Sequence, residues 1–324
     1  MTEILRTPRR FSLGAVALAA ALTVGAAFSP ALAQDTTETA KREGESRNKQ
    51  TLPPGPAEKP TPRTGEAFTF SAGLDTSSHF ISFGADVWGG GDDANPFGQD
   101  STRFAYGTVN AKVSNELSLF LNLWSDINNN AEDTIGGHIQ EIDVNAGLSY
   151  KFGEDTPLTG FTLGLAHTHW IFAGETENAV EVSLAYADTG KYDSMGMGAD
   201  FGLNPSVLLH YRYDVIGGQE DDVAVLQLGV RPTFTFNAES EYPITLAVPA
   251  AVAFFLGEYQ GGDDGFGYAN IGLSASVPLA FIPVEYGAWT AGATAVFWHT
   301  PDDSIPTNPE ENFVVTSLSV GVSF

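Results

Sequence analysis

The chain has 324 residues, no cysteine, 35 glycines, and 40 acidic against 15 basic residues, which gives a formal net charge of −25. The lack of cysteine excludes disulfide scaffolds, thiolate metal centres and a cysteine nucleophile. The acidic balance argues against binding to nucleic acid, whose phosphates would be repelled. With 22 Phe, 10 Tyr and 5 Trp beside the glycines, the composition favours β structure.

Residues 1–33 have the three parts of a secretory signal peptide. Arg6, Arg9 and Arg10 precede an apolar run over residues 13–28, and small residues end the segment at Ala33. The apolar run is shorter than the roughly 20 residues of a membrane-spanning helix. We therefore expect cleavage after Ala33 and export from the cytoplasm, rather than an N-terminal anchor.

Residues 34–67 form a polar, proline-rich segment of mixed charge without apolar periodicity. Such a segment cannot bury enough surface to offset the entropy lost on ordering. We expect it to be a disordered leader that precedes one folded domain over residues 68–324.

From residue 68 onward the apolar residues recur with a period of two. Along the last predicted strand, Val314, Leu318 and Phe324 share one face, while serine and glycine dominate the other. A secreted soluble β-sandwich, the alternative, would carry abundant charges on its polar face. Here the polar faces are mostly Gly, Ser, Thr and Asn. The pattern therefore favours a barrel that is apolar towards lipid and polar towards its lumen.

The alternation predicts an all-β fold, an antiparallel up-and-down transmembrane barrel of about twelve strands. The strands are expected near residues 68–88, 103–113, 117–126, 139–152, 161–172, 178–188, 201–215, 223–237, 244–259, 266–281, 288–299 and 312–324. One set of connections is predicted to be periplasmic turns and the alternate set external loops. An even strand count with both chain ends on one side is typical of bacterial outer-membrane barrels.

The first predicted strand changes phase along its length. The apolar residues Phe68 and Phe70 occupy even-numbered positions, whereas Ile81 and Phe83 occupy odd-numbered positions. A β-bulge near residues 77–79 would reset the phase within one long strand. A separate hairpin there is the alternative, and it would make thirteen strands.

Tryptophans fall at predicted strand ends. Trp88, Trp124, Trp170 and Trp298 lie at loop ends, and Trp289 lies at a turn end. This placement predicts an aromatic belt at the headgroup layer, where an amphipathic ring is favoured.

The C-terminus resembles the assembly signal of Gram-negative outer-membrane barrels, with Phe324 preceded by Val322 and Val320. The resemblance implies recognition by the barrel-assembly machinery and a location in the outer membrane. Shorter motifs, Trp124-Ser125 and the Glu-Ile-Asp of residues 141–143, resemble those of the TorF-like porins of proteobacteria. That resemblance implies a porin-like barrel over most of residues 68–324.

Several polar side chains of the predicted strands would project into the lumen. They are Asn122, Glu141, Asp143, Asn145, Lys151, His210, Arg212, Asp214, Arg231 and Asn270. Barrels of eight strands are filled by side chains and barrels of about sixteen are open, so twelve strands lie between these cases. We expect a narrow passive pore for small polar solutes. A non-conducting structural or adhesive barrel remains the alternative.

The predicted external loops are acidic. Their acidic residues are Asp92, Asp93, Asp100, Glu132, Asp133, Glu175, Glu177, Glu220, Asp221, Asp222, Asp263, Asp264, Asp302, Asp303, Glu310 and Glu311. Such a rim would attract cations within roughly a Debye length, about 8 Å at physiological salt. We therefore expect a weak cation preference if there is a pore. Divalent cations are possible partners at these carboxylates, although no loop has full calcium-binding spacing.

Enzymatic and metal-dependent functions receive little support from the sequence. His167 and His169 share a strand face but supply only two ligands, with no obvious third. Ser125 and His167 would lie two strands apart, which is poor geometry for a catalytic pair. We predict neither catalysis nor a cofactor, and the sequence leaves the oligomeric state open.

Overall fold

The computed structural model describes residues 67–87, 94–98, 101–128, 134–198, 201–213 and 223–324. Several sequence predictions fall outside these ranges: the signal peptide, residues 34–66 of the leader, Trp88, Asp92, Asp93, Asp100, Glu132, Asp133, Asp214, Glu220, Asp221 and Asp222. Within the described ranges, no helix has the length and apolar character needed to cross a membrane.

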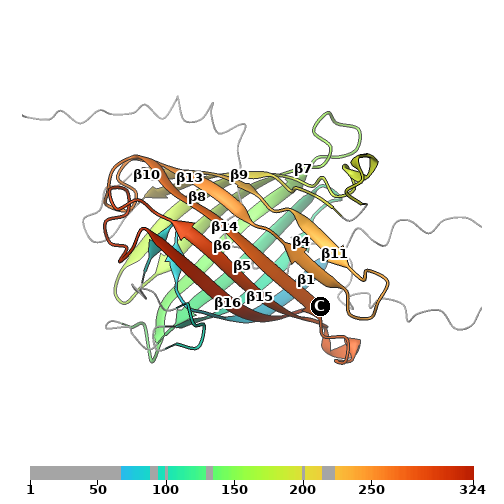
Figure 1. Ribbon diagram of the computed structural model, residues 1–324, viewed down its shortest axis with the longest axis horizontal. Helices are drawn as coiled ribbons and strands as arrows, with labels where there is room; N and C mark the ends of the chain where they lie inside the picture. Colours follow the sequence, from blue (N-terminus) through green and yellow to red (C-terminus); the bar gives the residue numbers. More distant parts are fainter. Residues whose placement is uncertain (1–66, 88–93, 99–100, 129–133, 199–200, 214–222) are drawn as a thin grey trace, which may run out of the picture.

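One continuous antiparallel sheet makes up the wall of the molecule (Figure 1). Its strands are β1 (Phe68–Ser77), β4 (Thr102–Lys112), β5 (Leu117–Ile127), β6 (Ile139–Lys151), β7 (Phe161–Ile171), β8 (Thr176–Tyr186), β9 (Ser206–Tyr213), β10 (Val223–Val230), β11 (Thr233–Phe236), β12 (Ile244–Ala247), β13 (Ala250–Leu256), β14 (Gly265–Pro278), β15 (Ala288–His299) and β16 (Asn312–Ser323).

The sheet closes into a barrel because β1 pairs with both β4 and β16, and β14 pairs with β15. Proline has no N–H for the ladder, so Pro232 separates β10 from β11 and Pro249 separates β12 from β13. Each of these pairs forms one wall strand, which gives twelve strands in all. The predicted fold class is confirmed, and the soluble sandwich is excluded.

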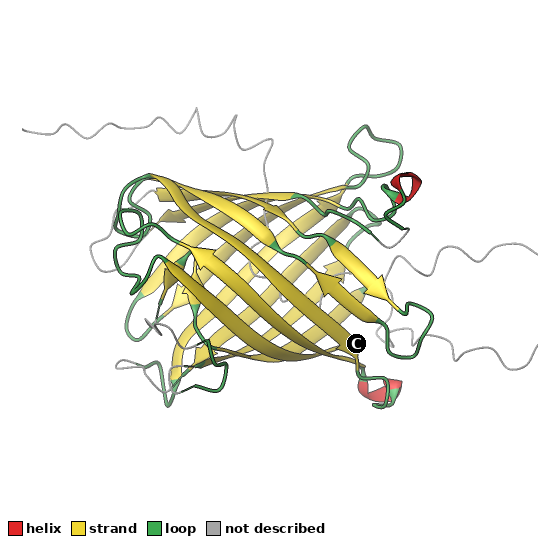
Figure 2. Ribbon diagram, viewed as in Figure 1, coloured by secondary structure: helices red, strands yellow, loops and turns green. Residues whose placement is uncertain are grey.

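The two ends of the barrel differ. We call the end that contains Phe68 and Phe324 the turn end, and the opposite end the loop end. The last residue is fixed at the turn end, where the N–H of Phe324 donates to the carbonyl of Phe70 at 2.8 Å. Two 3-10 turns, η3 (Asp193–Met195) and η4 (Val284–Tyr286), lie in connections at this same end (Figure 2).

The outer face of the wall is apolar. On β5, Leu119, Leu121 and Leu123 are 44%, 45% and 50% exposed, while the alternate residues Phe120 and Asn122 face the lumen and are half-buried. The same alternation recurs on the other wall strands, as predicted. A closed sheet with exposed apolar residues outside and polar residues inside is the wall of an outer-membrane-type barrel, because closure pairs the backbone groups that hydrocarbon cannot.

The first strand differs from the prediction. β1 ends at Ser77, and the chain then leaves the wall and folds into the lumen as a hairpin of β2 (Ile81–Ser82) and β3 (Ala85–Asp86). The predicted bulge is therefore wrong. The phase of the apolar residues changes because Ile81 and Phe83 pack against the inside of the barrel and not along its wall. We call residues 78–87 the strap.

Candidate functional site in the lumen

The strap crosses the lumen near the loop end. At one side of the barrel the ring of Phe80 packs against Phe104 of β4 and Trp124 of β5, with centroid distances of 5.5 and 5.2 Å. At the far side Phe83 packs against His210 of β9, at 4.2 Å. The strap is therefore held between two parts of the wall that are distant along the sheet.

A network of hydrogen bonds centred on Asn308 holds the strap in place. Its Oδ1 accepts from the N–H of Asp86 at 2.8 Å, and its Nδ2 donates to the carbonyl of Gly84 at 2.9 Å. The same Nδ2 donates to Thr300 Oγ1 at 2.8 Å. Because Asn308 and Thr300 belong to the connection between β15 and β16, the last loop at the loop end holds the strap in place.

The tip of the strap is conformationally demanding. Phe83 has a φ of +46° and Gly84 a φ of +87°, which makes a two-residue hairpin turn with left-handed geometry at both positions. For a residue with a side chain this conformation costs roughly 1–2 kcal/mol. Burial of the Phe83 ring offsets that cost. Gly84 cannot be replaced without a clash, because an added Cβ would lie 2.6 Å from the Tyr268 ring.

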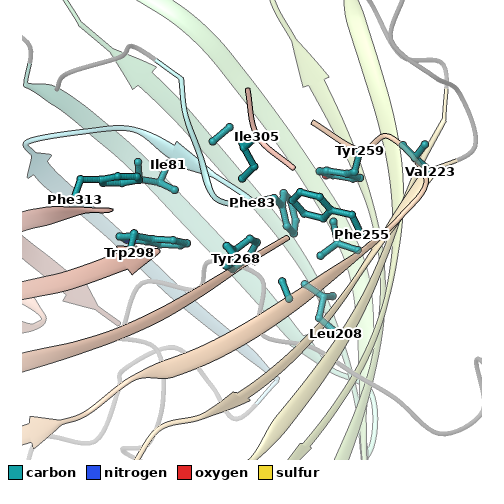
Figure 3. Packing of buried hydrophobic residues seen from close by; sticks show 13 residues of the cluster. Ile81, Phe83, Leu208, Val223, Phe255, Tyr259, Tyr268, Trp298, Ile305 and Phe313 are labelled. Carbon is teal, nitrogen blue, oxygen red and sulfur yellow. The ribbon is translucent and has the colours of Figure 1, made fainter. Parts of the chain in front are cut away.

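An apolar cluster surrounds the tip and fills this part of the lumen (Figure 3). Its buried residues are Ile81, Phe83, Ala85, Leu208, Val223, Val225, Ala253, Phe255, Tyr259, Tyr268, Trp298, Ile305 and Phe313. They come from the strap, from the inner faces of β9, β10 and β13 to β16, and from two connections at the loop end. The core of this barrel is thus inside its lumen, at one end.

A second group of buried residues, the acidic cluster, lies on the inner faces of β5, β6 and β8. Its members are Asp126, Glu141, Asp143, Glu177 and Glu181. Asp126 is paired directly across the sheet with Glu141. Asp143 lies two residues from Glu141 on the same face of β6, directly across the sheet from Trp170. These pairings bring carboxyl groups from three neighbouring parts of the sheet together on the inner wall.

Two basic side chains of β9 face the acidic cluster. The Nδ1 atom of His210 lies 2.9 Å from Glu181 Oε1, and Arg212 Nη1 lies 4.0 Å from Glu177 Oε2. Arg212 also donates to the backbone carbonyl of Tyr259 at 2.6 Å and lies over its ring, 4.3 Å from the centroid. Burial raises the pKa of the Tyr259 phenol well above its usual range. At this level of the lumen, five carboxyl groups thus face two basic groups.

Towards the turn end the inner face becomes small and polar. Asn122 donates to Thr108 Oγ1 at 2.8 Å, and Asn145 donates to Thr168 Oγ1 at 3.0 Å. The inner faces of β14, β15 and β16 carry mainly serine, threonine and glycine here. The lumen therefore has two levels. The level at the loop end is packed and contains the acidic cluster, and the level at the turn end has mostly small polar side chains, with Lys151 and Arg231 in the same half.

The structure places most of the predicted lumen residues on the inner face. Those on the inner face are Asn122, Glu141, Asp143, Asn145, His210, Arg212 and Asn270. Lys151 is at an inward position of β6, like Asn145, and is exposed at the turn end. Arg231 lies in the break between β10 and β11. Asp214 is outside the described residues.

Sequence analysis missed three members of the acidic cluster. Glu177 was expected in a loop but lies in β8, where it is 7% exposed and faces the lumen. Glu181 and Asp126 were not singled out. Two features indicate that these residues face the lumen. Glu181 is paired across the sheet with His210, and Asp126 lies on the same face of β5 as Asn122.

The predicted tryptophan belt is largely wrong. Trp124 stacks on Phe104, Trp170 lies 5.3 Å from His210, and Trp298 is 7% exposed within the apolar cluster. These three indoles point into the barrel, and of the described tryptophans Trp289 alone is on the outer face. The outward aromatic rings near the loop end include Tyr211 and Tyr213, which stack on each other.

The two histidines considered for a metal site have other partners. His167 Nε2 lies 2.8 Å from the Tyr213 hydroxyl, and His169 Nδ1 lies 2.9 Å from Asn178 Oδ1. Ser125, the candidate nucleophile, donates to the carbonyl of Ala105 at 3.3 Å. In the described part of the chain, no group of three or more His, Asp or Glu residues is arranged to hold a metal ion.

No family model and no curated protein matches the chain, so the TorF-like resemblance stays a prediction. Among solved structures, the NanC porin aligns over 80% of this chain and 99% of its own, with 12% identity and a TM-score of 0.42. The translocator domain of the autotransporter NalP from Neisseria meningitidis covers 81% and 89%, with 13% identity and a TM-score of 0.34. A mutant of Rh. blastica porin covers 80% and 99%, with 9% identity and a TM-score of 0.27. At these scores the likeness adds no argument about function.

Proposed function

We propose that this chain is an outer-membrane porin-like channel that passes small polar solutes by diffusion and prefers cations. The acidic cluster carries the proposal. It lies on the inner wall at the level where the strap narrows the lumen, so a solute that passes the barrel comes close to these carboxylates. A low-dielectric wall strengthens their field, which favours cations over anions.

The turn-end half of the lumen supports the same function. Its Ser, Thr and Asn side chains can exchange hydrogen bonds with water and with polar solutes, and they impose no charge barrier. Selectivity would then be set mainly by the carboxylates at the loop end. The exposed acidic residues of the external loops, such as Asp263, Asp302 and Glu311, add a negative field at the mouth.

One observation favours a second function, a non-conducting structural barrel. The strap packs against two distant parts of the wall, and every residue of the apolar cluster around Phe83 is at most 8% exposed. A strap that never moves would leave no passage wide enough for solutes at the loop end. The barrel would then be a closed cup that is accessible from the turn end.

Single-channel recording in planar lipid bilayers separates the two functions. The channel proposal predicts discrete conductance steps and, in a potassium chloride gradient, a reversal potential of the sign for cation selectivity. The absence of steps above the lipid background would support the closed barrel. A reversal potential for anion selectivity would contradict the role of the acidic cluster.

The proposal includes export and assembly. The predicted signal peptide would direct the chain across the inner membrane, and the barrel-assembly machinery would insert it into the outer membrane of a Gram-negative bacterium through the signal at Phe324, Val322 and Val320. Divalent cations are proposed as weak partners of the acidic loops. We propose no catalytic activity.

A further inference from the structure

A groove lies on the outer face of the barrel where β1 is flanked by β4 and β16. Residues 94–98 lie against this part of the wall, since Thr76 Oγ1 donates to the carbonyl of Pro96 at 2.5 Å and Thr316 Oγ1 donates to that of Ala94. The groove beside this segment has a volume of about 490 Å³. Its lining includes Leu74, Phe97, Arg103, Ile127, Leu318 and Val320.

The lining is mainly apolar and has one cation, Arg103, at its loop-end edge. It also includes Thr76, Ser319 and Asp75, whose carboxylate accepts a hydrogen bond from the Tyr106 hydroxyl. Leu74, Phe97 and Leu318 are exposed, and they belong to the surface that hydrocarbon covers. Arg103 is the second residue of β4 and is exposed, and its guanidinium makes no hydrogen bond or ion pair with the described residues. The other lysines and arginines of the described ranges lie at the turn end or, like Arg212, are buried.

An unpaired guanidinium at the edge of the hydrocarbon layer is placed for a phosphate. Arginine binds phosphate through two parallel N–H donors, which makes a strong and directional contact. Arg103 lies near the loop end of β4, where we expect acyl chains to give way to headgroups. The exposed acidic side chains elsewhere at the loop end would repel an anion, so Arg103 is the attachment point that remains.

We propose that this groove binds one phosphorylated, multiply acylated glycolipid of the outer leaflet, with an acyl chain along Leu74 and Leu318 and a phosphate on Arg103. The loop end faces outward in the proposed topology, and this class of glycolipid forms the outer leaflet of such membranes. The inference therefore rests on the proposed outer-membrane location, but not on whether the barrel conducts.

Native mass spectrometry of the full-length protein in detergent tests the site. The probes are a bisphosphorylated hexa-acyl glycolipid, its dephosphorylated form, and phosphatidylglycerol. Wild-type protein is expected to retain one bisphosphorylated glycolipid, and Arg103→Gln to weaken its retention about tenfold. Lys112→Gln, an exposed cation at the other end of the same strand, is the matched control and should bind as wild type does.

A second variant tests the apolar half of the site with Arg103 intact. Leu74→Trp would fill part of the groove and should lower glycolipid retention, and the heat-dependent gel shift of each variant reports that its barrel is folded. Equal retention by Arg103→Gln and Lys112→Gln would overturn the proposal. So would full retention by Leu74→Trp, or equally tight binding of the dephosphorylated glycolipid or of phosphatidylglycerol. Bilayer recordings report on the channel independently, so either proposal can fail without the other.

Discussion

The aromatic ring of Phe83 packs against the imidazole of His210, with 4.2 Å between their centroids. The two residues come from the strap and from the barrel wall, and they join the apolar cluster to the acidic cluster. His210 contacts Phe83 with its ring and Glu181 with its Nδ1 atom. One residue of the wall therefore contacts both the strap and the acidic cluster.

Replacement of Asn308 should loosen the strap. Asn308→Ala removes three hydrogen bonds and leaves the N–H of Asp86 and the carbonyl of Gly84 without that partner, at a cost of about 1–3 kcal/mol for each buried group. We expect larger single-channel conductance or a longer open time in planar bilayers. The control is Asn312→Ala, which removes an exposed asparagine at the same end of the barrel. Identical recordings from the two variants would show that the strap does not limit passage.

Neutralisation of Glu177 should reduce cation preference. Glu177→Gln removes one carboxylate of the acidic cluster and leaves the facing Arg212 charged, so the field in the lumen becomes less negative. The reversal potential in a potassium chloride gradient should move towards zero. Glu175→Gln, two residues earlier and exposed in the loop, should shift it less because solvent screens that site. Equal shifts would place the selectivity at the mouth and not in the lumen.

A glycine on β1 makes room for an aromatic ring on the next strand. The side chain of Tyr106 lies over Gly73, where any added Cβ would collide with it. We expect Gly73→Ala to destabilise the barrel by about 1–3 kcal/mol through overpacking. The matched variant Gly107→Ala changes the facing strand on its outer side, where the nearest atom would be 3.7 Å away.

The temperature at which each of these glycine variants loses its folded gel mobility is the measurement. Because both substitutions stiffen the unfolded chain equally, the difference between them isolates the contact with Tyr106. If Gly73→Ala lost its folded gel mobility at the same temperature as Gly107→Ala, or at a higher one, the packing of Tyr106 over Gly73 would be contradicted.

The terminal phenylalanine should matter for assembly. Phe324 closes the seam between β16 and β1, with its ring 6.0 Å from that of Phe70. Phe324→Ala should lower the amount of folded protein in the outer-membrane fraction several-fold. Phe281→Ala, a more exposed phenylalanine in a connection at the same end, is the control and should accumulate normally. Equal amounts of the two variants would argue against Phe324 as an assembly signal.

The barrel wall could be predicted from the sequence because its signal is local. On β5, three leucines alternate with Ser118, Phe120 and Asn122. Because successive side chains of a strand point to opposite faces, these two sets must lie on opposite faces of the sheet. The strand positions and the inward orientation of Glu141 and Asn145 follow directly from this alternation. The two proline breaks were not expected, but they leave the wall strands in the predicted order.

The interior was harder to predict because its contacts join residues far apart in the sequence. Ile81 and Phe83 alternate as a wall strand does, and nothing local reveals that Asn308 holds them inside the lumen. The tryptophans were different. Trp124 lies at an inward position of β5, like Asn122, so the alternation places it on the inner face. Its position near the end of the strand does not turn the indole towards the membrane.

Lipid contact along β5 can be measured most directly, since the chain has no cysteine of its own. Single cysteines at each position from 118 to 123 would carry a nitroxide spin label in lipid vesicles. Labels at Leu119, Leu121 and Leu123 are expected to collide mainly with oxygen, which concentrates in hydrocarbon. Labels at the alternate positions are expected to collide more with a water-soluble nickel complex. Collision rates without this period of two, or oxygen maxima at Ser118 and Asn122, would contradict a wall whose apolar face lies in the membrane.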